Sequence, residues 1–207
     1  MPPRKGAPNR RGAARREQIL DAAVELFAER GYRGSGLLEL AERVGMTHAG
    51  ILHHFGTKED LLRAVMARRD DILDRQASDL EGKGIVGLRD IRDPFEPPVL
   101  TRLATVLRTE NLDPGDPLHD YFVAGNQRVR ALVADEIRRG QLAGEIRTDV
   151  DPDIKAIEIV AFSIGIETQW LLEPDTIDRA HVFRSFLRSL LNDLAPAKSS
   201  KVRPRNG

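Results

Sequence analysis

The amino-acid sequence predicts an all-α protein, with a small N-terminal three-helix domain followed by a larger helical domain. Apolar residues recur along most of the chain at the three- and four-residue spacing of amphipathic helices, whereas no segment shows the alternation of a half-buried strand. Residues that commonly cap helices stand at the ends of these segments. Hydrophobic residues make up 41% and charged residues 31% of the 207 residues, a composition that suits a soluble globular protein with a substantial core.

The first three expected helices are closely spaced. The first carries one apolar stripe over residues 19–27 and ends before Gly31, which is free to take a positive φ. Ser35 is expected to cap the second helix, and Gly45 to end it. Thr47 is expected to cap a short third helix. This order predicts a helix, a tight glycine turn and a short helix near the N-terminus.

Six further helical segments follow in the chain. A capping box at residues 57–60 begins the first of them, a short piece spans 85–91, and another helix spans 99–110. After a long helix, Asp151-Pro152 begins a mostly apolar one, and a box-like cap at residues 175–178 begins the last.

The long helix has its own start and stop signals. Asp116 is expected to cap it, with Pro117 at its first position, and the helical pattern runs through Arg139. Gly140 and Gly144 are expected to end this helix, because glycine favours the residue that follows a helix.

The composition excludes several classes of protein. The chain has no cysteine, which rules out a disulfide framework, a cysteine nucleophile and a thiolate metal site. Residues 1–17 contain no apolar stretch, so they do not resemble a secretory signal. The longest apolar run, near residues 157–166, is shorter than the roughly 20 residues that a membrane-spanning helix needs. A cytoplasmic protein is therefore expected.

Charge is distributed unevenly along the chain, although the formal net charge is zero. Residues 1–58 carry ten Lys and Arg against six Asp and Glu, and residues 195–207 carry four Lys and Arg and no acid. The intervening residues 59–194 then carry a net charge of −8. A basic front end on an acidic body indicates a polyanionic partner for the front end, the alternative being that the basic tails only aid solubility.

A helix, a tight glycine turn and a short helix form the helix-turn-helix arrangement. Ala41 is small enough for the two helices to approach closely, and Gly45 makes the turn. Ile51 and Phe55 are expected to bury one side of the short helix, which leaves small and polar side chains on the other. Such a surface suits the major groove of DNA, which is roughly 12 Å wide.

Adjacent histidines at positions 53 and 54 leave three interpretations open. A metal site needs three or four converging ligands, but adjacent helical residues point to different sides and His48 cannot join both. A phosphate contact by an imidazole is the favoured interpretation, and packing of one histidine against the first helix is the third. Neither a metal ion nor any other cofactor is expected.

Residues 16–62 resemble the DNA-binding domain of the tetracycline-repressor (TetR) family of transcriptional regulators. The resemblance rests on the segments "ILDAAVELFAERGYRG" and "LLELAERVGMTHAGILHHFGTKEDLL". Many members have Gly-Thr-Leu-Tyr where this chain has Ala49-Gly50-Ile51-Leu52, so the tyrosine that usually contacts phosphate is replaced by Leu52. The expected DNA-binding residues are Arg15, Arg16, Ser35, Thr47, His48, Ala49, Gly50, His53, His54 and Lys58. Arg10 and Arg11 are expected to join Arg15 and Arg16 as a basic arm on phosphate or in the minor groove.

The resemblance also implies a division of the chain and a mode of action. The expected regions are a basic flexible arm at 1–15, the helix-turn-helix DNA-binding domain at 16–62 with its motif at about 36–55, an effector-binding and dimerisation domain at 63–195, and a disordered basic tail at 196–207. Family members are generally homodimers that pair through their last two helices. The resemblance therefore implies a sequence-specific regulator, most often a repressor, that a small-molecule effector releases from double-stranded operator DNA.

Two sets of residues in the larger domain are expected to serve the effector and the dimer. The expected effector-pocket residues are polar groups in apolar settings: Arg102, Thr105, Asn126, Gln127, Arg130, Glu167 and Trp170. The expected dimer-interface residues are Ile157, Ile164, Leu171, Phe183, Phe186 and Leu190. An unpaired charge in an apolar helix is costly, which draws attention to Glu167. The alternatives are pairing with an arginine for Glu167 and an ordinary core role for the two apolar helices.

The sequence does not favour two other functional classes. An enzyme is not expected, because the chain has no Gly-rich phosphate loop, no Gly-x-Ser-x-Gly and no metal-spaced His/Glu pair. The cluster Asp113, Asp116, His119 and Asp120 is explained by loop and helix-start chemistry. A non-specific DNA-packing protein would need basic charge throughout, which the acidic body contradicts.

Overall fold

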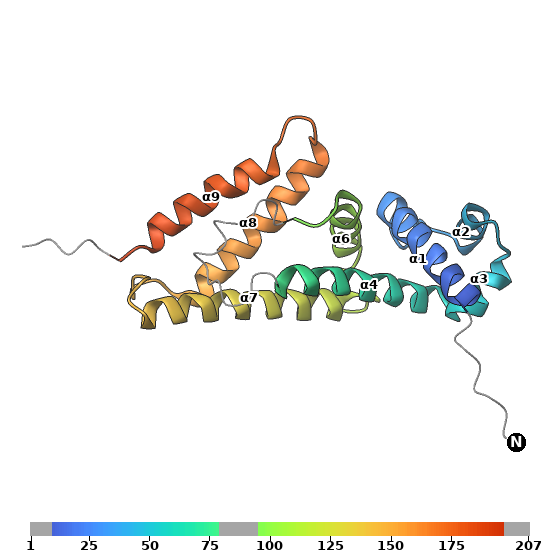
Figure 1. Cartoon of the computed structure of the whole chain (residues 1–207), viewed down its shortest axis with the longest axis horizontal. Coiled ribbons are helices and arrows are strands. Elements are labelled where there is room, and N and C mark those ends of the chain that lie inside the picture. The colour runs from blue at the N-terminus through green and yellow to red at the C-terminus, as the bar shows by residue number, and fades with distance from the viewer. Residues whose placement is uncertain (1–9, 79–94, 197–207) are drawn as a thin grey trace, which may run out of the picture. The chain divides into compact units, whose positions relative to one another are not determined.

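The computed structural model describes residues 10–78 and 95–196. These residues form eight helices and no strand (Figure 1), which confirms the predicted all-α class. The helices are α1 (Arg10–Arg30), α2 (Leu37–Val44), α3 (His48–Phe55), α4 (Lys58–Ser78), α6 (Pro98–Glu110), α7 (His119–Leu142), α8 (Pro152–Leu172) and α9 (Arg179–Leu194). The helical piece predicted at residues 85–91 and most of the predicted basic tail lie outside the described residues.

Two compact units make up the chain. The first contains α1 to α4, α6 and the first residues of α7, and the second contains the remainder of α7 with α8 and α9. The first unit thus extends beyond residues 16–62, because α6 packs against α1. The functional boundaries expected from the sequence remain predictions. Within the described segments, no helix is long and apolar enough to cross a membrane.

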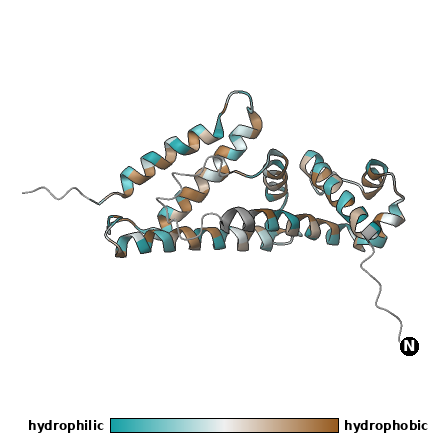
Figure 2. Cartoon of the chain, viewed as in Figure 1, coloured by the Kyte–Doolittle hydropathy of each residue, from teal (hydrophilic) through white to brown (hydrophobic). Residues whose placement is uncertain are grey.

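The core of the first unit is built around α1. Its apolar stripe is buried, with Ile19 and Phe27 at 0% and 1% exposure, and α1 contacts α2, α4 and α6. Leu40 of α2 and Ile51 of α3 are both fully buried in the same cluster. Hydrophobic and hydrophilic residues alternate along these helices (Figure 2), as expected of amphipathic helices with one buried stripe. Burial of each such large side chain contributes about 1.5–3 kcal/mol, so this core fixes α2 and α3 on α1.

The second unit is centred on the packing of α8 against α9. The rings of Phe162 and Phe186 are stacked, with centroids 3.7 Å apart, and Phe183 and Leu194 of α9 are buried. The backbone N–H of Arg147 donates to the carbonyl of Leu194 at 2.9 Å, which ties the loop before α8 to the end of α9.

Side-chain caps begin four of the helices, three of them where the sequence predicted; the last helix is capped by Asp178 and not by a box that opens at residue 175. Thr47 Oγ1 accepts from the N–H of Gly50 at 3.1 Å, Thr57 Oγ1 from Asp60 at 3.0 Å, Asp151 Oδ1 from Asp153 at 2.9 Å, and Asp178 Oδ1 from His181 at 2.9 Å. In the predicted capping box the Asp60 carboxylate accepts from the Thr57 hydroxyl, at 2.6 Å. Each cap satisfies a backbone donor that the first helical turn leaves without a partner.

The predicted role of Ser35 as a helix cap is wrong. The N-cap of α2 is Gly36, and the Ser35 hydroxyl donates instead to the carbonyls of Gly31 and Leu26, near the end of α1. The turn places this hydroxyl against the backbone carbonyls at the end of α1. Ser35 is buried as a result.

The predicted start of the long helix and its predicted end at Gly140 are wrong, whereas Gly144 follows the helix with φ 74°, as predicted. The helix α7 begins at His119 and ends at Leu142, so Asp116 and Pro117 precede it. Asp116 serves the loop, where its carboxylate accepts from the Asp113 N–H at 3.1 Å. Gly140 lies inside α7. A Cβ at this position would be 2.6 Å from Ile146 Cδ1, so glycine leaves room for that buried side chain.

A buried polar network holds the middle of α4. Arg69 Nε donates to Glu96 Oε2 at 2.8 Å, and both residues are buried. The Tyr121 hydroxyl at the start of α7 donates to Asp70 Oδ1 at 2.5 Å. Burial opposes the charge on Arg69, but Glu96 and Tyr121 together raise the pKa of its guanidinium, which stays charged. This network ties α4 to the segment before α6 and to the start of α7.

We expect Glu96→Gln to lower the free energy of unfolding by about 3 kcal/mol, because it leaves the buried Arg69 charge without its counter-ion. Urea unfolding measures this change. The matched control is Asp135→Asn, which removes a carboxylate from an exposed pair with Arg138 and should leave stability nearly unchanged. Equal effects of the two substitutions would contradict a structural role for the buried network.

Candidate nucleic-acid interface

The helix α2, the turn at Gly45 and the helix α3 form the predicted helix-turn-helix. Gly45 has φ 63°, a left-handed conformation, and the N–H of Met46 donates to the Ala41 carbonyl at 2.8 Å. Ala41 is buried at the contact between α1 and α2, while Ile51 and Phe55 bury the inner side of α3. The local sequence therefore sets the angle between the two helices and the side of α3 that faces outward.

The outer side of α3 carries small and polar residues. Thr47, His48, Ala49 and His53 are exposed, and Gly50 is half-buried. Beside His48, the first turn of this helix carries only the small residues Ala49 and Gly50, so its backbone can approach a flat or concave partner closely there. This surface is the one that the sequence predicted to enter a major groove.

The two adjacent histidines lie edge-on to each other on α3. The ring centroids of His53 and His54 are 5.7 Å apart in an edge-on arrangement, and His54 lies 6.5 Å from Phe55. Residues 10–78 and 95–196 contain no group of three or more His, Cys, Asp or Glu side chains able to hold a metal ion. The exposed position of His53 suits a contact with a partner, whereas His54 is half-buried.

The predicted flexible arm is helical from Arg10 onward, so this part of the prediction is wrong. Arg15 donates to the carbonyl of Gly45 at 3.2 Å and to Gln18 at 2.9 Å. The guanidinium of Arg16 lies 4.7 Å from the centre of the Phe55 ring. From α1, Arg15 therefore contacts the turn of the helix-turn-helix, and Arg16 packs against Phe55 at the end of α3.

Lys58, a predicted phosphate contact, is turned inward at the start of α4. Its ammonium donates to the carbonyl of Tyr32 at 2.5 Å and lies 4.3 Å from the centre of the Tyr32 ring. Burial lowers the pKa of Lys58, and the negative charge of Glu110 partly opposes this effect. Ser35 is likewise removed from the surface, because it is buried against α1.

Sequence reasoning did not single out Tyr32 and Glu110, which meet at the end of α1. The backbone N–H of Tyr32 donates to Glu110 Oε2 at 2.6 Å. The signal that could have found this contact is the position of Glu110 in the last turn of its helix, where the helix dipole disfavours a carboxylate.

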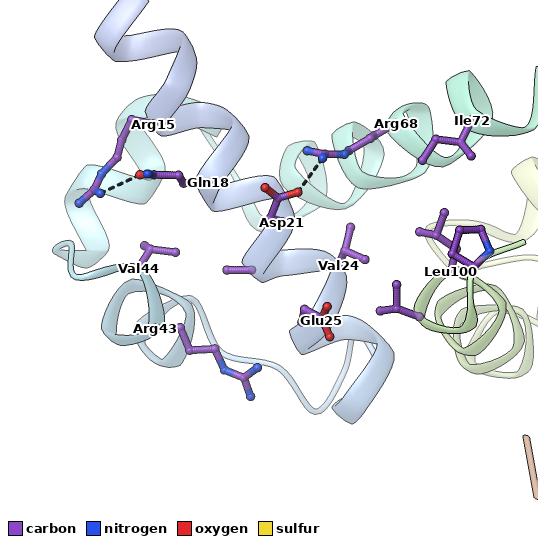
Figure 3. A pocket seen from close by; sticks show the side chains of 13 residues that line it. Arg15, Gln18, Asp21, Val24, Glu25, Arg43, Val44, Arg68, Ile72 and Leu100 are labelled. Atoms are coloured by element: carbon purple, nitrogen blue, oxygen red, sulfur yellow. Dashed lines mark hydrogen bonds and ion pairs between the residues drawn. The ribbon is translucent and has the colours of Figure 1, made fainter. Parts of the chain in front are cut away.

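A groove of about 710 Å³ lies on the first unit between α1, α2, α4 and α6 (Figure 3). Its lining mixes apolar side chains such as Ile72 and Leu100 with charged ones. Among these charges, Arg68 pairs with Asp21 at 2.6 Å, and it also pairs with Glu17 at 2.9 Å. The groove is not the predicted effector pocket, because none of the predicted effector residues lines it.

The predicted effector residues fall in both units. Arg102 and Thr105 lie on α6 in the first unit, whereas Asn126, Gln127 and Arg130 on α7 and Glu167 and Trp170 on α8 lie in the second. Thr105 Oγ1 is buried and has no hydrogen-bond partner among the described residues. The guanidinium of Arg179 lies 4.1 Å from the centre of the Trp170 ring, so one side of the indole is occupied within the chain.

The predicted dimer residues divide into two groups. Phe183 and Leu190 are buried within the second unit, so they are corrected to core residues of the single chain. Ile157 is 47% exposed, and Ile164, Leu171 and Phe186 are half-buried. Ile154 and Leu172 of α8, which were not predicted, are also exposed. The helix α8 therefore presents more apolar surface to solvent than the sequence analysis assigned to it.

Two family models match the chain. Residues 19–65 match the model described as "Bacterial regulatory proteins, tetR family", and residues 116–199 match "BetI-type transcriptional repressor, C-terminal". The first match spans α2, α3 and the turn between them.

Relatives and solved structures agree with these matches. The HTH-type transcriptional repressor Rv1474c of Mycobacterium tuberculosis is 35% identical over 150 residues, covering 69% of this chain and 74% of that protein. The HTH-type transcriptional regulator TtgR of Pseudomonas putida is 28% identical over 180 residues, covering 79% and 83%. A transcriptional regulator from Saccharomonospora viridis, solved in complex with choline, is 26% identical with a TM-score of 0.72, covering 87% of this chain and 96% of that one.

We expect Thr47→Ala to destabilise the first unit by about 1 kcal/mol, because it removes the side chain that caps α3. Thr47→Ser keeps the hydroxyl and should be close to neutral. The control is Thr109→Ala, whose exposed hydroxyl bonds only to a carbonyl within α6. Chemical denaturation of the three variants measures the difference, and a Thr47→Ala variant as stable as Thr109→Ala would exclude the cap as a stabilising contact.

Proposed function

Because the chain belongs to the TetR family of DNA-binding bacterial transcriptional regulators, we propose that it is a repressor that binds operator DNA as a homodimer and is released by a small-molecule effector. The observation that carries this proposal is the outer surface of α3, where exposed Thr47, His48 and Ala49 precede a half-buried Gly50. A helix of this shape fits a major groove, and the Thr47 cap fixes its first turn.

Two copies of α3 are required for a specific site under this proposal. A two-fold dimer presents two identical helices to successive major grooves, about 34 Å apart along the duplex. The predicted operator is therefore an inverted repeat. His48 and His53 are the proposed contacts to bases or phosphates from α3, and Arg11, exposed in the first turn of α1, is a further proposed phosphate contact.

The proposed dimer forms through α8 and α9. Exposed apolar side chains on α8 support this choice, since Ile154, Ile157 and Leu172 are 55%, 47% and 77% exposed in the single chain. Apolar side chains gathered on one helix are typical of a surface that another protein covers. The partner proposed here is a second copy of the same helices, which would form a four-helix bundle.

The proposed effector site draws on the polar residues of α7 and α8 in the second unit. Within the first unit, the buried Thr105 hydroxyl of α6 is a separate candidate contact for a polar ligand group, since a buried hydroxyl commonly has a hydrogen-bond partner. Because Arg179 covers one side of Trp170, this indole would contact an effector through its remaining side or edge. An effector that binds a few kcal/mol more tightly to a dimer whose two α3 helices do not match the spacing of the major grooves would suffice to release DNA.

We expect Ala49→Glu to weaken operator binding by at least about 100-fold, because it places a negative charge on the surface that faces the phosphates. A footprint upstream of the protein's own and neighbouring genes, followed by a shift assay with competitor DNA, measures this change. The same substitution at Ala131, which is exposed on α7, should leave binding unchanged. Equal binding of both variants, or equal binding to every fragment, would argue against a specific α3 interface.

We expect Ile157→Asp to convert the dimer into monomers, because it buries a charge wherever α8 is covered by its partner. Sedimentation velocity measures the mass, and circular dichroism verifies that the exposed position tolerates the change. The control is Leu142→Asp, which introduces the same charge at the exposed end of α7. A dimer that survives Ile157→Asp but is lost with Leu142→Asp would place the interface elsewhere.

A further inference from the structure

Two helix C-termini meet around the carboxylate of Glu110. Glu110 is the last residue of α6, and its side chain lies against the end of α1. The contact is close, since a Cβ added at Gly31 would be 2.1 Å from Glu110 Oε1. Gly31 has φ 72°, a backbone conformation that favours glycine, and the Glu110 carboxylate occupies the space that a Cβ would take.

This position is electrostatically unfavourable for a carboxylate. The end of a helix carries partial negative charge, and an acid placed there costs about 0.3–1 kcal/mol. Glu110 stands at the ends of two helices at once. It is stabilised by the N–H of Tyr32 at 2.6 Å and by the nearby positive charge of Lys58, which in turn donates to the Tyr32 carbonyl at 2.5 Å. The backbone of Tyr32 thus donates through its N–H to Glu110 and accepts through its carbonyl from Lys58.

A second acid of the same region forms an ion pair with an arginine. Asp116, in the loop after α6, forms an ion pair with Arg33, the neighbour of Tyr32. Arg33 and Lys58 both belong to the basic N-terminal part of the chain: Arg33 lies in the turn before the helix-turn-helix, and Lys58 is the first residue of α4 after it. Asp116, in the loop after α6, pairs with Arg33 directly, whereas Glu110 of α6 acts on Lys58 through its charge and through Tyr32. Both carboxylates therefore offset positive charge of the segment that carries the proposed DNA surface.

We propose that Glu110 and Asp116 take the place of DNA phosphates at Lys58 and Arg33, so that the end of α6 competes with operator DNA for these two cations. Glu110 is a positioning residue, which acts on Lys58 through its charge and through the backbone of Tyr32. Asp116 acts on Arg33 directly. This inference rests on the proposed function and deepens it, because a change at the end of α6 alters how many phosphates the protein can contact.

The first test is the salt dependence of operator binding for Glu110→Gln and Asp116→Asn. Both substitutions keep an oxygen for the backbone N–H that the acid accepts from, but remove the charge. Each should tighten binding by roughly three- to tenfold and steepen the slope of log K against log salt by about one phosphate contact. The control is Glu136→Gln, which removes the same charge from a pair with Arg139 on α7 and should change neither.

A double-variant cycle separates this inference from a structural role for Glu110. In a Lys58→Met background, Glu110→Gln should no longer tighten binding, because the cation that it releases is gone. If Glu110→Gln weakens binding, leaves it unchanged, or tightens it equally in both backgrounds, the inference is wrong. Thermal unfolding of each variant verifies that the fold persists.

A second readout does not depend on DNA. Lys58 is the only lysine between residues 6 and 82, so acylation of its amine is followed on one peptide by mass spectrometry. Glu110→Gln should speed this acylation by roughly threefold or more, because the amine leaves the Tyr32 carbonyl more often. An unchanged rate would overturn the inference. Failure of the wild-type protein to bind any genomic fragment would instead overturn the proposed function, and the acylation rates would still decide the inference.

Discussion

The burial of α1 between the helix-turn-helix and α6 is the constraint on which the first unit depends. One stripe of α1, with Ile19, Leu26 and Phe27 almost fully buried, contacts α2, α4 and α6. The outer side of α3 faces outward because its inner side, through Ile51 and Phe55, belongs to this same cluster. The same helix ends where Glu110 and Lys58 meet at Tyr32, so one apolar stripe positions both the proposed DNA surface and the contacts that regulate it.

Most of the fold and part of the site could be predicted from the sequence, because they depend on local chemistry. The apolar spacing of α1, the glycine turn at Gly45 and the cap at Thr47 each act within a few residues. The family resemblance of residues 16–62 is confirmed by the matches to residues 19–65 and to HTH-type repressors. The exposure of Thr47, His48 and Ala49 follows from the same periodicity that buries Ile51.

Several of the errors concern groups whose partners are set by the folded chain. Ser35 has the side chain of a helix cap, but the turn carries its hydroxyl to the end of α1. Gly140 looks like the end of a helix, yet it gives space to Ile146. Lys58 looks like a free cation at a helix start, and only the structure shows its ammonium on the Tyr32 carbonyl. Spacing along the chain contains no information on these tertiary partners.

The charges of this molecule fall into two classes with different sensitivity to ionic strength. The Arg69–Glu96 pair is buried, so dissolved ions screen it little, whereas cations such as Arg33 and Arg11 stand in solvent. Raising the ionic strength therefore weakens the outer attractions first and leaves the anchorage of α4 intact. A high salt concentration can thus dissociate this protein from a polyanion without unfolding its helices. Dissociation by salt should therefore be reversible.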